Sequence, residues 1–310
     1  QTSLVAAVTS TWLSLQSSDQ LLSLTQRTLA TREDSLRLTK LRFDNGATSA
    51  LDLRQAESLT AAAQASLAQQ QRQRALDLNA LTLLVGQPIP GNLLVPDQPT
   101  ASPAQSSNSA QLWLSDVPAG LPSDLLERRA DIRQAEQQLI AANANIGAAR
   151  AAFFPRISLT ASAGTASNEL SGLFKDGSWG FTLAPQALLP IFDAGRNQAS
   201  LDSARVGREI AVAQYEKAIQ TAFREVSDAL AGQATLGEQL RAQQVQATAE
   251  AERFRLAELR YRNGVASFLD VLDAQRSLFA TEQALLQTRL TQQQNQVALY
   301  KALGGGFDRR

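Results

Sequence analysis

The first part of the chain carries apolar residues at helical spacing. Residues from about 2 to 43 contain neither Pro nor Gly, and an apolar residue recurs every seven positions at Leu22, Leu29, Leu36 and Phe43. Such a repeat forms a seam along one side of a helix, and the seam packs against a neighbouring helix. We therefore predict a long helix that is covered along this seam by a second helix.

A turn and a second helix follow. Asp44-Asn45-Gly46 interrupts the apolar pattern with turn-forming residues. The second helix is predicted from about Ser49 to Val85, and it is ended by Gly86, Pro88 and Pro90. Residues 1–86 are thus expected to form a helical hairpin roughly 50 Å long, at about 1.5 Å per residue.

A connector and a third helix come next. Residues 87–123 are rich in Pro, Ser, Asn and Asp, which predicts an irregular connector with one short strand at Gln111–Leu114. Pro122-Ser123-Asp124 offers an N-cap for a helix from about Leu125 to Phe154, which Pro155 ends. Residues 124–155 are therefore assigned to this helix.

Strict alternation marks a β region over residues 156–192. Apolar positions alternate with small or polar ones in two segments, Ile157–Gly164 and Trp179–Ala187. Two strands with one apolar face and one small, polar face predict a hairpin. Its apolar face packs either on a soluble core or against lipid. The small polar face, the nearby aromatic residues and the lack of other strands to pack against favour lipid.

A second helical hairpin is predicted over residues 193–304. Pro190–Arg196 ends the strand, and a helix from about Asn197 to Arg262 follows, roughly 100 Å long at about 1.5 Å per residue. Asn263-Gly264 turns the chain into a return helix from about Ser267 to Leu303. Glycines at 304–306 end that helix, and residues 305–310 form a short tail.

The two helical hairpins are copies of one another. With a constant offset of 218, Leu41–Gly46 aligns with Leu259–Gly264, and Ser49, Leu51, Asp52 and Ala56 align with Ser267, Leu269, Asp270 and Ala274. No gap is needed from about residue 2 to residue 86, which indicates an internal repeat. Because Gln1 aligns with Ile219, inside a helix, we expect more helix and a second strand pair upstream, in a longer protein.

Composition narrows the possible chemistry. The 310 residues have a formal net charge of zero, so nothing in the charge balance favours nucleic acid as a partner. The chain contains no Cys and no His, which excludes disulfides, Cys-His nucleophiles and the usual zinc sites, and we expect neither a metal nor a cofactor. An uninterrupted apolar run of about 18 residues is also missing, which argues against a transmembrane helix.

Four motifs occur in order along this duplicated frame. They are Gly120–Ile132, Ala149–Pro155, Pro190–Arg196 and Tyr261–Gln275. Together they make the chain resemble, over essentially its whole length, the TolC-type outer-membrane efflux protein family, in particular the lipoprotein channels of drug-efflux systems. The chain departs from the family pattern by carrying only one strand pair and by lacking a Cys that could bear a lipid.

The resemblance implies a mainly α fold with a small β part, assembled as a homotrimer. Its coiled-coil hairpins form a long α-helical barrel across the periplasm, and its strands join a transmembrane β-barrel in the outer membrane. The implied partners are a periplasmic adaptor (membrane fusion) protein, an inner-membrane proton-driven efflux pump and outer-membrane lipid. The expected location is the outer membrane, with a large periplasmic part.

A candidate gate lies at the start of the return helix. Asp270 and Asp273 are three residues apart and so share one face of that helix. The resemblance matches both to the acidic constriction of the closed channel and matches Leu269 to an apolar gate position. An acid at a helix N-terminus is also favoured by the helix dipole, so both interpretations stay open for Asp270, whereas the gate is favoured for Asp273. The first copy has Gln55 in place of Asp273.

The resemblance places both turns at the periplasmic tip of the tunnel. The residues implied in adaptor contact or tip packing are Asn45, Gly46, Asp52, Tyr261, Arg262, Asn263 and Gly264. On residue type alone, the two glycines allow positive φ at turns. Tyr261 is equally a seam residue and Arg262 a solvated cation. Ala266 stands where some family members carry a basic gate residue, so that ionic latch is expected to be absent.

A dense charge cluster precedes the third helix. Glu127, Arg128, Arg129 and Asp131 are interpreted as solvated ion pairs on a helix face. The resemblance places them in the band around the middle of the tunnel.

The function favoured by these patterns is a passive exit duct of a tripartite multidrug efflux system. A type I secretion exit duct of the same fold is one alternative, and a periplasmic coiled-coil scaffold without transport is another. An enzyme that uses Asp270 and Asp273 as a carboxylate pair is disfavoured, because adjacent turns of one helix cannot flank a sugar.

Overall fold

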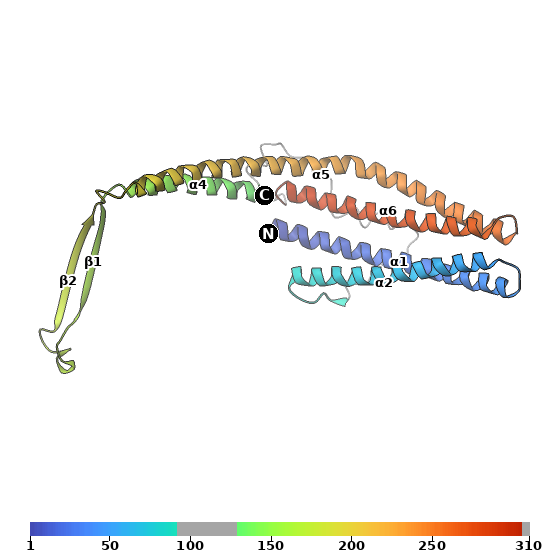
Figure 1. Ribbon diagram of the computed structural model, residues 1–310, viewed down its shortest axis with the longest axis horizontal. Helices are drawn as coiled ribbons and strands as arrows, with labels where there is room; N and C mark the ends of the chain where they lie inside the picture. The colour runs from blue at the N-terminus through green and yellow to red at the C-terminus, as the bar shows by residue number, and fades with distance from the viewer. Residues whose placement is uncertain (92–128, 306–310) are drawn as a thin grey trace, which may run out of the picture. The chain divides into compact units, whose positions relative to one another are not determined.

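The computed structural model describes residues 1–91 and 129–305. In these residues five long helices accompany one strand pair and a short 3-10 turn (Figure 1). The elements are α1 (Thr2–Asp44), α2 (Ala50–Val85), α4 (Ala130–Ala151), β1 (Arg156–Thr165), η2 (Leu170–Gly172), β2 (Trp179–Leu188), α5 (Arg196–Arg262) and α6 (Phe268–Ala302). The mainly α prediction with one β hairpin is therefore confirmed.

The predicted features between α2 and β1 are only partly described by the structure. The predicted strand at Gln111–Leu114 and the predicted cap at 122–124 lie outside the described residues. The third helix, α4, ends at Ala151 rather than at Phe154. Its last turn tightens, since the amides of Phe153 and Phe154 donate to carbonyls three residues back, at 3.2 and 3.1 Å. Pro155 also disfavours helical geometry in the residue before it.

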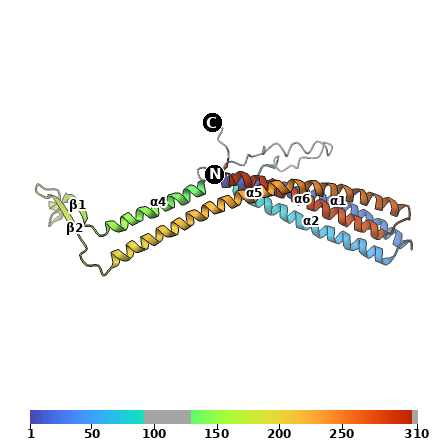
Figure 2. The same ribbon diagram turned by 90° about the horizontal axis from the view of Figure 1, so that it is seen from above.

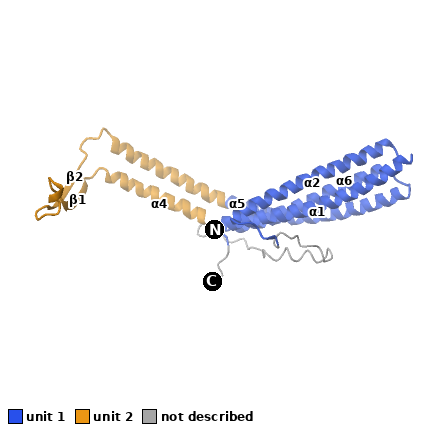
Figure 3. Ribbon diagram, turned by 90° about the horizontal axis from the view of Figure 1, so that it is seen from below, with its two compact units in different colours: residues 1–128, 223–310 blue, residues 129–222 orange. Residues whose placement is uncertain are grey.

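The chain divides into two compact units, which Figure 3 colours separately. The first unit comprises residues 1–128 and 223–310, and the second comprises residues 129–222. The boundary falls within α5, so this helix contributes to both units. Both hairpin turns lie at the same end of the first unit (Figure 1 and Figure 2).

Each long helix ends at its turn in the same hydrogen-bonded motif. In the first copy the Gly46 amide donates to the Phe43 carbonyl at 2.8 Å, and the Ala47 amide donates to the Arg42 carbonyl at 2.8 Å. This is the Schellman pattern, which requires positive φ at one residue, and Gly46 has φ of 70°. The second copy repeats it, with Gly264 at φ of 72° and bonds of 3.0 and 2.9 Å.

Each return helix begins in the same way as its copy. Ser49 caps α2 by accepting the Asp52 amide at 3.2 Å, while the Asp52 carboxylate accepts the Ser49 amide at 3.3 Å. Ser267 and Asp270 form the same reciprocal pair at α6, at 3.3 and 3.2 Å. A capping box of this kind satisfies donors that the first helical turn leaves free. The predicted duplication therefore extends to the hydrogen bonds of both turns.

The packing of α1 corrects the predicted seam. The Leu22 series is only half-buried, and Phe43 is 39% exposed. A second series at the same spacing is buried instead, and it is polar: Ser18, Thr25, Arg32 and Thr39. Since α1 packs along both α2 and α6 (Figure 1), it needs two seams rather than one. Small hydroxyl residues suit such close contacts, because the Thr25 and Thr39 hydroxyls donate to carbonyls of their own helix at 2.8 Å.

An apolar core joins the two hairpins near their turns. Its fully buried members come from α2 and α6, namely Ala56, Phe268, Val271 and Leu272. Partly buried residues of α1, α2 and α5 pack around it: Leu36, Leu59, Phe254, Ala257 and Tyr261. Burying one large side chain such as Phe268 contributes about 2–3 kcal/mol. The turn-proximal end of the first unit is thus fixed by apolar contacts between the copies.

Polar contacts hold each hairpin farther from its turn. In the first hairpin Arg74 pairs with Asp19, and the Ser18 hydroxyl donates to Asp77. In the second, the Asn295 side-chain amide donates to the Ala229 carbonyl at 2.8 Å. Asn295 aligns with Asp77 in the repeat, so the same position makes a cross-helix contact in both copies.

The second unit contains α4, the strand pair and the first part of α5. The strands pair antiparallel with Ile157 opposite Ala187 and Ala163 opposite Phe181. Residues directly opposite share a face, so one face is apolar and the other carries Ser158, Thr160, Ser162, Thr182 and Gln186. All residues of both strands are exposed in this chain. Among the described residues, none of the helices combines the length and apolarity needed to span a membrane.

The loop after β2 begins α5 by a local cap. The Asp193 carboxylate accepts the amides of Gly195 and Asn197 at 3.0 and 2.8 Å. Gly195 has φ of 83°, which a residue with a side chain rarely adopts. The Asn197 side chain then donates to the Ala152 carbonyl at the end of α4, at 3.1 Å. The predicted end of the strand at Pro190–Arg196 is therefore also the start signal of the next helix.

The turn geometry predicts opposite effects for two glycine substitutions. A Cβ at Gly46 meets no atom within 4 Å, so Gly46→Ala tests backbone conformation alone, and we expect it to destabilise the fold by about 1 kcal/mol. Gly147 lies in α4 with equally open space, and Gly147→Ala is expected to stabilise by up to about 1 kcal/mol. Thermal unfolding followed by circular dichroism measures both, and shifts of the same sign would contradict this account.

Candidate functional site

The three candidate gate residues lie on one exposed face of α6. Leu269 is 52% exposed, and Asp270 and Asp273 are exposed as well. The residues between and beside them, including Val271, Leu272 and Ala274, are buried. The buried residues fix the rotation of α6 and so determine which face the candidate gate residues occupy. The predicted shared face of the two aspartates is present, whereas their role in gating stays a prediction.

Asp270 and Asp273 have different surroundings. Asp270 takes part in the capping box with Ser267, which gives it a structural task at the helix start. Asp273 instead accepts a hydrogen bond from Arg253 of α5, with 2.7 Å between Nη2 and Oδ2. This contact and a second one to Glu250 raise the pKa of the Arg253 guanidinium, so the cation is firmly charged. Asp273 is thus the one of the two whose carboxylate contacts the neighbouring helix.

The acid of the first copy is bound more closely by its own turn. The Asp52 carboxylate accepts hydrogen bonds from the hydroxyls of Thr48 and Ser49 at 2.7 and 2.9 Å, in addition to the capping-box amide. The Thr48 hydroxyl is the main reason that the pKa of Asp52 is lowered. In the second copy Ala266 stands in the place of Thr48 and offers no hydroxyl to Asp270.

The four turn residues have local structural roles. The side-chain amides of Asn45 and Asn263 donate to the carbonyls of Leu41 and Leu259, at 2.7 and 2.8 Å. Gly46 and Gly264 supply the positive φ. All four are exposed at the ends of the hairpins, so their surfaces remain available to a partner.

Tyr261 links the two hairpins, while Arg262 does not. The Tyr261 ring lies 5.2 Å from the Phe268 ring between centroids, and the Arg42 guanidinium of α1 lies 4.7 Å from the Tyr261 centroid. A cation above an aromatic ring is stabilised by the ring quadrupole. Arg262 pairs with Glu258 of its own helix at 2.6 Å. The expected tie between neighbouring helices is therefore made by Tyr261 together with Arg42.

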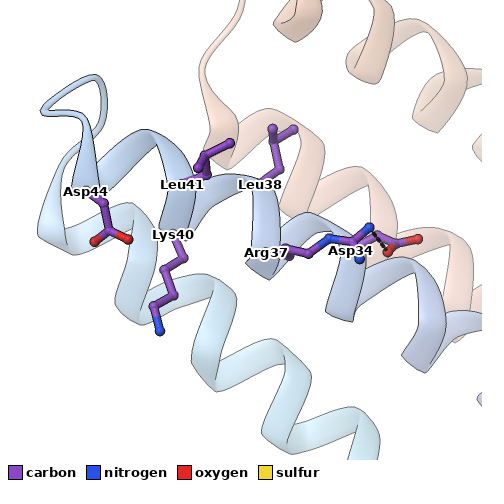
Figure 4. A pocket seen from close by; sticks show the side chains of 6 residues that line it. All are labelled: Asp34, Arg37, Leu38, Lys40, Leu41 and Asp44. Atoms are coloured by element: carbon purple, nitrogen blue, oxygen red, sulfur yellow. Dashed lines mark hydrogen bonds and ion pairs between the residues drawn. The ribbon is translucent and has the colours of Figure 1, made fainter.

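A shallow surface hollow runs along α1 beside the first turn. It has a volume of about 680 Å³, and its lining comes entirely from α1 (Figure 4): Asp34, Arg37, Leu38, Lys40, Leu41 and Asp44. Asp34 and Arg37 pair at 2.9 Å, whereas Leu38 and Leu41 are exposed. The hollow thus combines charged side chains with two uncovered apolar ones close to the tip.

Two arginines are buried, and one of them departs from the sequence prediction. Arg129 was expected in a solvated cluster, yet it is 6% exposed and donates to Asp131 at 2.6 Å, which lowers the pKa of Asp131. Glu127 and Arg128 lie outside the described residues. Arg32 is buried between α1, α2 and α6, where it donates to the Leu59 carbonyl at 3.0 Å and lies over the Phe279 ring. Burial lowers its pKa.

Sequence reasoning missed Arg253, Arg42 and Arg32, although one signal was available for the first. In an antiparallel hairpin, residues at equal distances from the turn face each other. Arg253 and Asp273 are each ten residues from Asn263. The rings that Arg42 and Arg32 contact lie on the other hairpin, so no such count within one hairpin reveals these two contacts.

The arrangement described above defines a class of protein built from duplicated helical hairpins with an exposed β hairpin. A family model described as outer membrane efflux protein matches residues 1–87 and 121–305. The solvent efflux pump outer membrane protein SrpC of Pseudomonas putida is 50% identical over 307 residues, which cover 99% of this chain and 63% of SrpC. The chain thus spans a little under two thirds of the length of that relative.

Solved structures show the same fold. A membrane protein from Pseudomonas aeruginosa superposes with a TM-score of 0.82 and 44% identity, over 100% of this chain and 67% of that one. The open state of the MtrE outer membrane channel of Neisseria gonorrhoeae has a TM-score of 0.77 and 41% identity, over 99% of this chain and 67% of that one. The chain belongs to the outer membrane efflux protein family, which confirms the resemblance that its motifs indicate.

The lowered pKa of Asp52 predicts a pH-dependent contribution to stability. The fold stabilises the carboxylate, so its contribution is present above the unfolded-state pKa of about 3.9 and is lost as the pH falls through the folded-state pKa. We expect Asp52→Asn to lower the melting temperature at pH 7 by on the order of 1 °C, and to have a smaller effect near pH 3.

Glu57→Gln is the matched control for this prediction. Glu57 is on the same helix and pairs only with Arg54 at the surface, at 2.7 Å. Asp52→Asn should have a smaller effect on the melting temperature in a Thr48→Ala background than in the wild type. An effect of Asp52→Asn that is equal at both pH values would contradict the assigned stabilisation of the charged form.

Proposed function

We propose that the protein carrying this chain is the outer-membrane exit duct of a tripartite multidrug efflux system, through which substrates leave passively. The observation that carries the proposal is the duplicated pair of hairpins with both turns at one end, in a chain 50% identical to an efflux pump outer membrane protein. No bond is made or broken in such a duct, and the energy comes from a partner pump.

The order of the helices in the first unit supports a ring of copies. Along this unit α2 lies beside α1, α1 beside α6 and α6 beside α5 (Figure 1), and α2 also contacts α6 near the turns. In this order α2 and α5 are the outer helices. In the proposed homotrimer, α5 of one copy packs against α2 of the next, and the ring closes around a tunnel.

The strand pair supports a position in the outer membrane. Its apolar face includes Ile157, Leu159, Phe181 and Leu183, all at least half exposed in this chain. Lipid is the environment that such a face suits, while the opposite hydroxyl-rich face suits water. In the proposed assembly the strands of three copies lie in the outer membrane, and the helices extend into the periplasm.

The tip surface supports docking of a periplasmic adaptor protein, which in turn joins the duct to an inner-membrane, proton-driven pump. The exposed turn residues Asn45, Gly46, Asn263 and Gly264 lie together at one end. The hollow beside Leu38 and Leu41 adds uncovered apolar surface next to them. Asp52, Tyr261 and Arg262 shape this end through their capping, stacking and ion-pair contacts.

The proposed gate is the exposed face of α6 that carries Leu269, Asp270 and Asp273. In a ring of three copies each position becomes a ring of like side chains. Rings of carboxylate in a narrow pore favour cations and restrict flow. Asp273 is the principal candidate, because Asp270 already serves the cap of α6.

The exit-duct proposal predicts assembly and conduction. The full-length protein is expected to behave as a detergent-dependent trimer in light scattering and to form ion-conducting channels in planar bilayers. A detergent-free monomer without conductance would instead support a periplasmic scaffold and refute the duct.

The gate proposal predicts a specific gain of conductance. Asp273→Ala removes both the charge and the contact with Arg253, so single-channel conductance should rise, by roughly twofold or more for a limiting constriction. Glu252→Ala is the matched control, since Glu252 is an exposed acid on α5 that pairs with Arg255 of the same helix at 2.6 Å. Equal conductance of Asp273→Ala and wild type counts against the gate.

A further inference from the structure

The contact between Arg253 and Asp273 is part of a network that spans α5 and α6. Arg253 Nη2 donates to Asp273 Oδ2 at 2.7 Å. Arg253 Nη1 donates to Glu250 Oε2 at 3.1 Å and to Ser277 Oγ at 3.3 Å. Ser277 lies one turn beyond Asp273 on α6, so one guanidinium bridges a full turn of that helix. The Arg253 fork therefore fixes Asp273 in direction as well as in distance.

The backbone on both sides of this network is held by the apolar core. Phe254, which follows Arg253, packs against the core of the hairpins. Leu272 and Ala274, on either side of Asp273, are 2% and 0% exposed. Surface ion pairs are usually weak because two mobile side chains must be ordered. Here both side chains leave fixed positions on packed helices, so less freedom is lost when they pair.

The internal repeat shows that the network exists once in each chain. At the aligned positions the first copy has Ser35 for Arg253 and Gln55 for Asp273. It also has Arg32 for Glu250 and Leu59 for Ser277. The first copy thus lacks both the cation and the carboxylate of this pair, as expected if the two act as a unit. Ser35, which aligns with Arg253, makes a contact between the hairpins instead: the Gln275 side-chain amide donates to Ser35 Oγ at 3.4 Å.

We propose that Arg253 is a positioning residue for the gate, which orients the Asp273 carboxylate and offsets its charge, and so sets the cation preference of the constriction. This inference rests on the proposed function, because it needs Asp273 to face a pore. A ring of unpaired carboxylates attracts cations strongly, whereas a guanidinium in contact with each carboxylate weakens the field along the axis.

The test measures ion selectivity in the full-length channel. Reversal potentials in a KCl gradient across planar bilayers give the cation-to-anion permeability ratio. For Arg253→Gln we expect the ratio to rise roughly twofold or more, because the Asp273 charge loses its counter-charge. Arg255→Gln is the matched control: it removes an equal charge two residues away, from an arginine that pairs with Glu252 of its own helix, and it should leave the ratio unchanged.

Two further variants test the coupling directly. Asp273→Asn should lower the ratio, and Arg253→Gln should then change the ratio less on that background than in wild type. A charge-conserving variant serves as a check in case Arg253→Gln fails to assemble. Arg253→Lys keeps the counter-charge and loses only the fork, so it should change the ratio less than Arg253→Gln does.

The outcomes separate the inference from the gate itself. A ratio and a conductance that do not respond to Asp273→Asn refute the proposed gate. A response to Asp273→Asn combined with no response to Arg253→Gln refutes only the role of Arg253. The same holds if Arg255→Gln matches Arg253→Gln, or if Arg253→Lys changes the ratio as much as Arg253→Gln does.

Discussion

The closed turn of each hairpin is the constraint on which the rest of the structure depends. Asn45 and Asn263 bind back to their own helices, the following glycines take positive φ, and the return helices begin in reciprocal caps. The amides of Gly46, Ala47, Gly264 and Val265 are hydrogen-bonded as well, which leaves the turns little conformational freedom. The turn therefore sets the register of each hairpin, that is, which residues of its two helices lie opposite each other. The pairs Asp19–Arg74 and Arg253–Asp273 follow from this register.

The lateral packing follows from that register. A helix with neighbours on two sides cannot bury one wide apolar face, so α1 buries two narrow seams, one of which contains Thr25, Arg32 and Thr39. Close approach there requires small side chains whose hydroxyls find acceptors in their own helix. Large apolar side chains are buried near the turns, around Phe268 and Leu272, and also far from them, where Leu15, Leu81, Val297 and Leu299 are at most 3% exposed. Apolar burial thus supports both ends of the hairpins, and polar contacts such as that of Arg74 with Asp19 add to it.

What the sequence predicts well is local. Turn residues, helix caps and the alternation of the strands depend on neighbours within a few positions, so the hairpins, their duplication and the β pair were predicted nearly to the residue. What it predicts poorly depends on which faces meet. The pattern within one helix favours the Leu22 series as the main seam and a solvated Arg129, because it contains no information on the second neighbour of α1 or on the surroundings of Arg129. The candidate gate is an intermediate case. Its acids and their shared face were predicted from spacing, whereas the partner of Asp273 required the register of the hairpin.

The strand pair has a consequence for how this protein reaches its final state. All residues of β1 and β2 are exposed in the single chain, and a lone two-stranded hairpin is at best marginally stable in water. In the proposed duct, the free energy that fixes this hairpin comes from lipid and from neighbouring strands. Where those strands belong to other copies, folding of the hairpin is an assembly reaction that depends on concentration. A protomer in transit carries an apolar ribbon that needs protection from aggregation until its companions arrive.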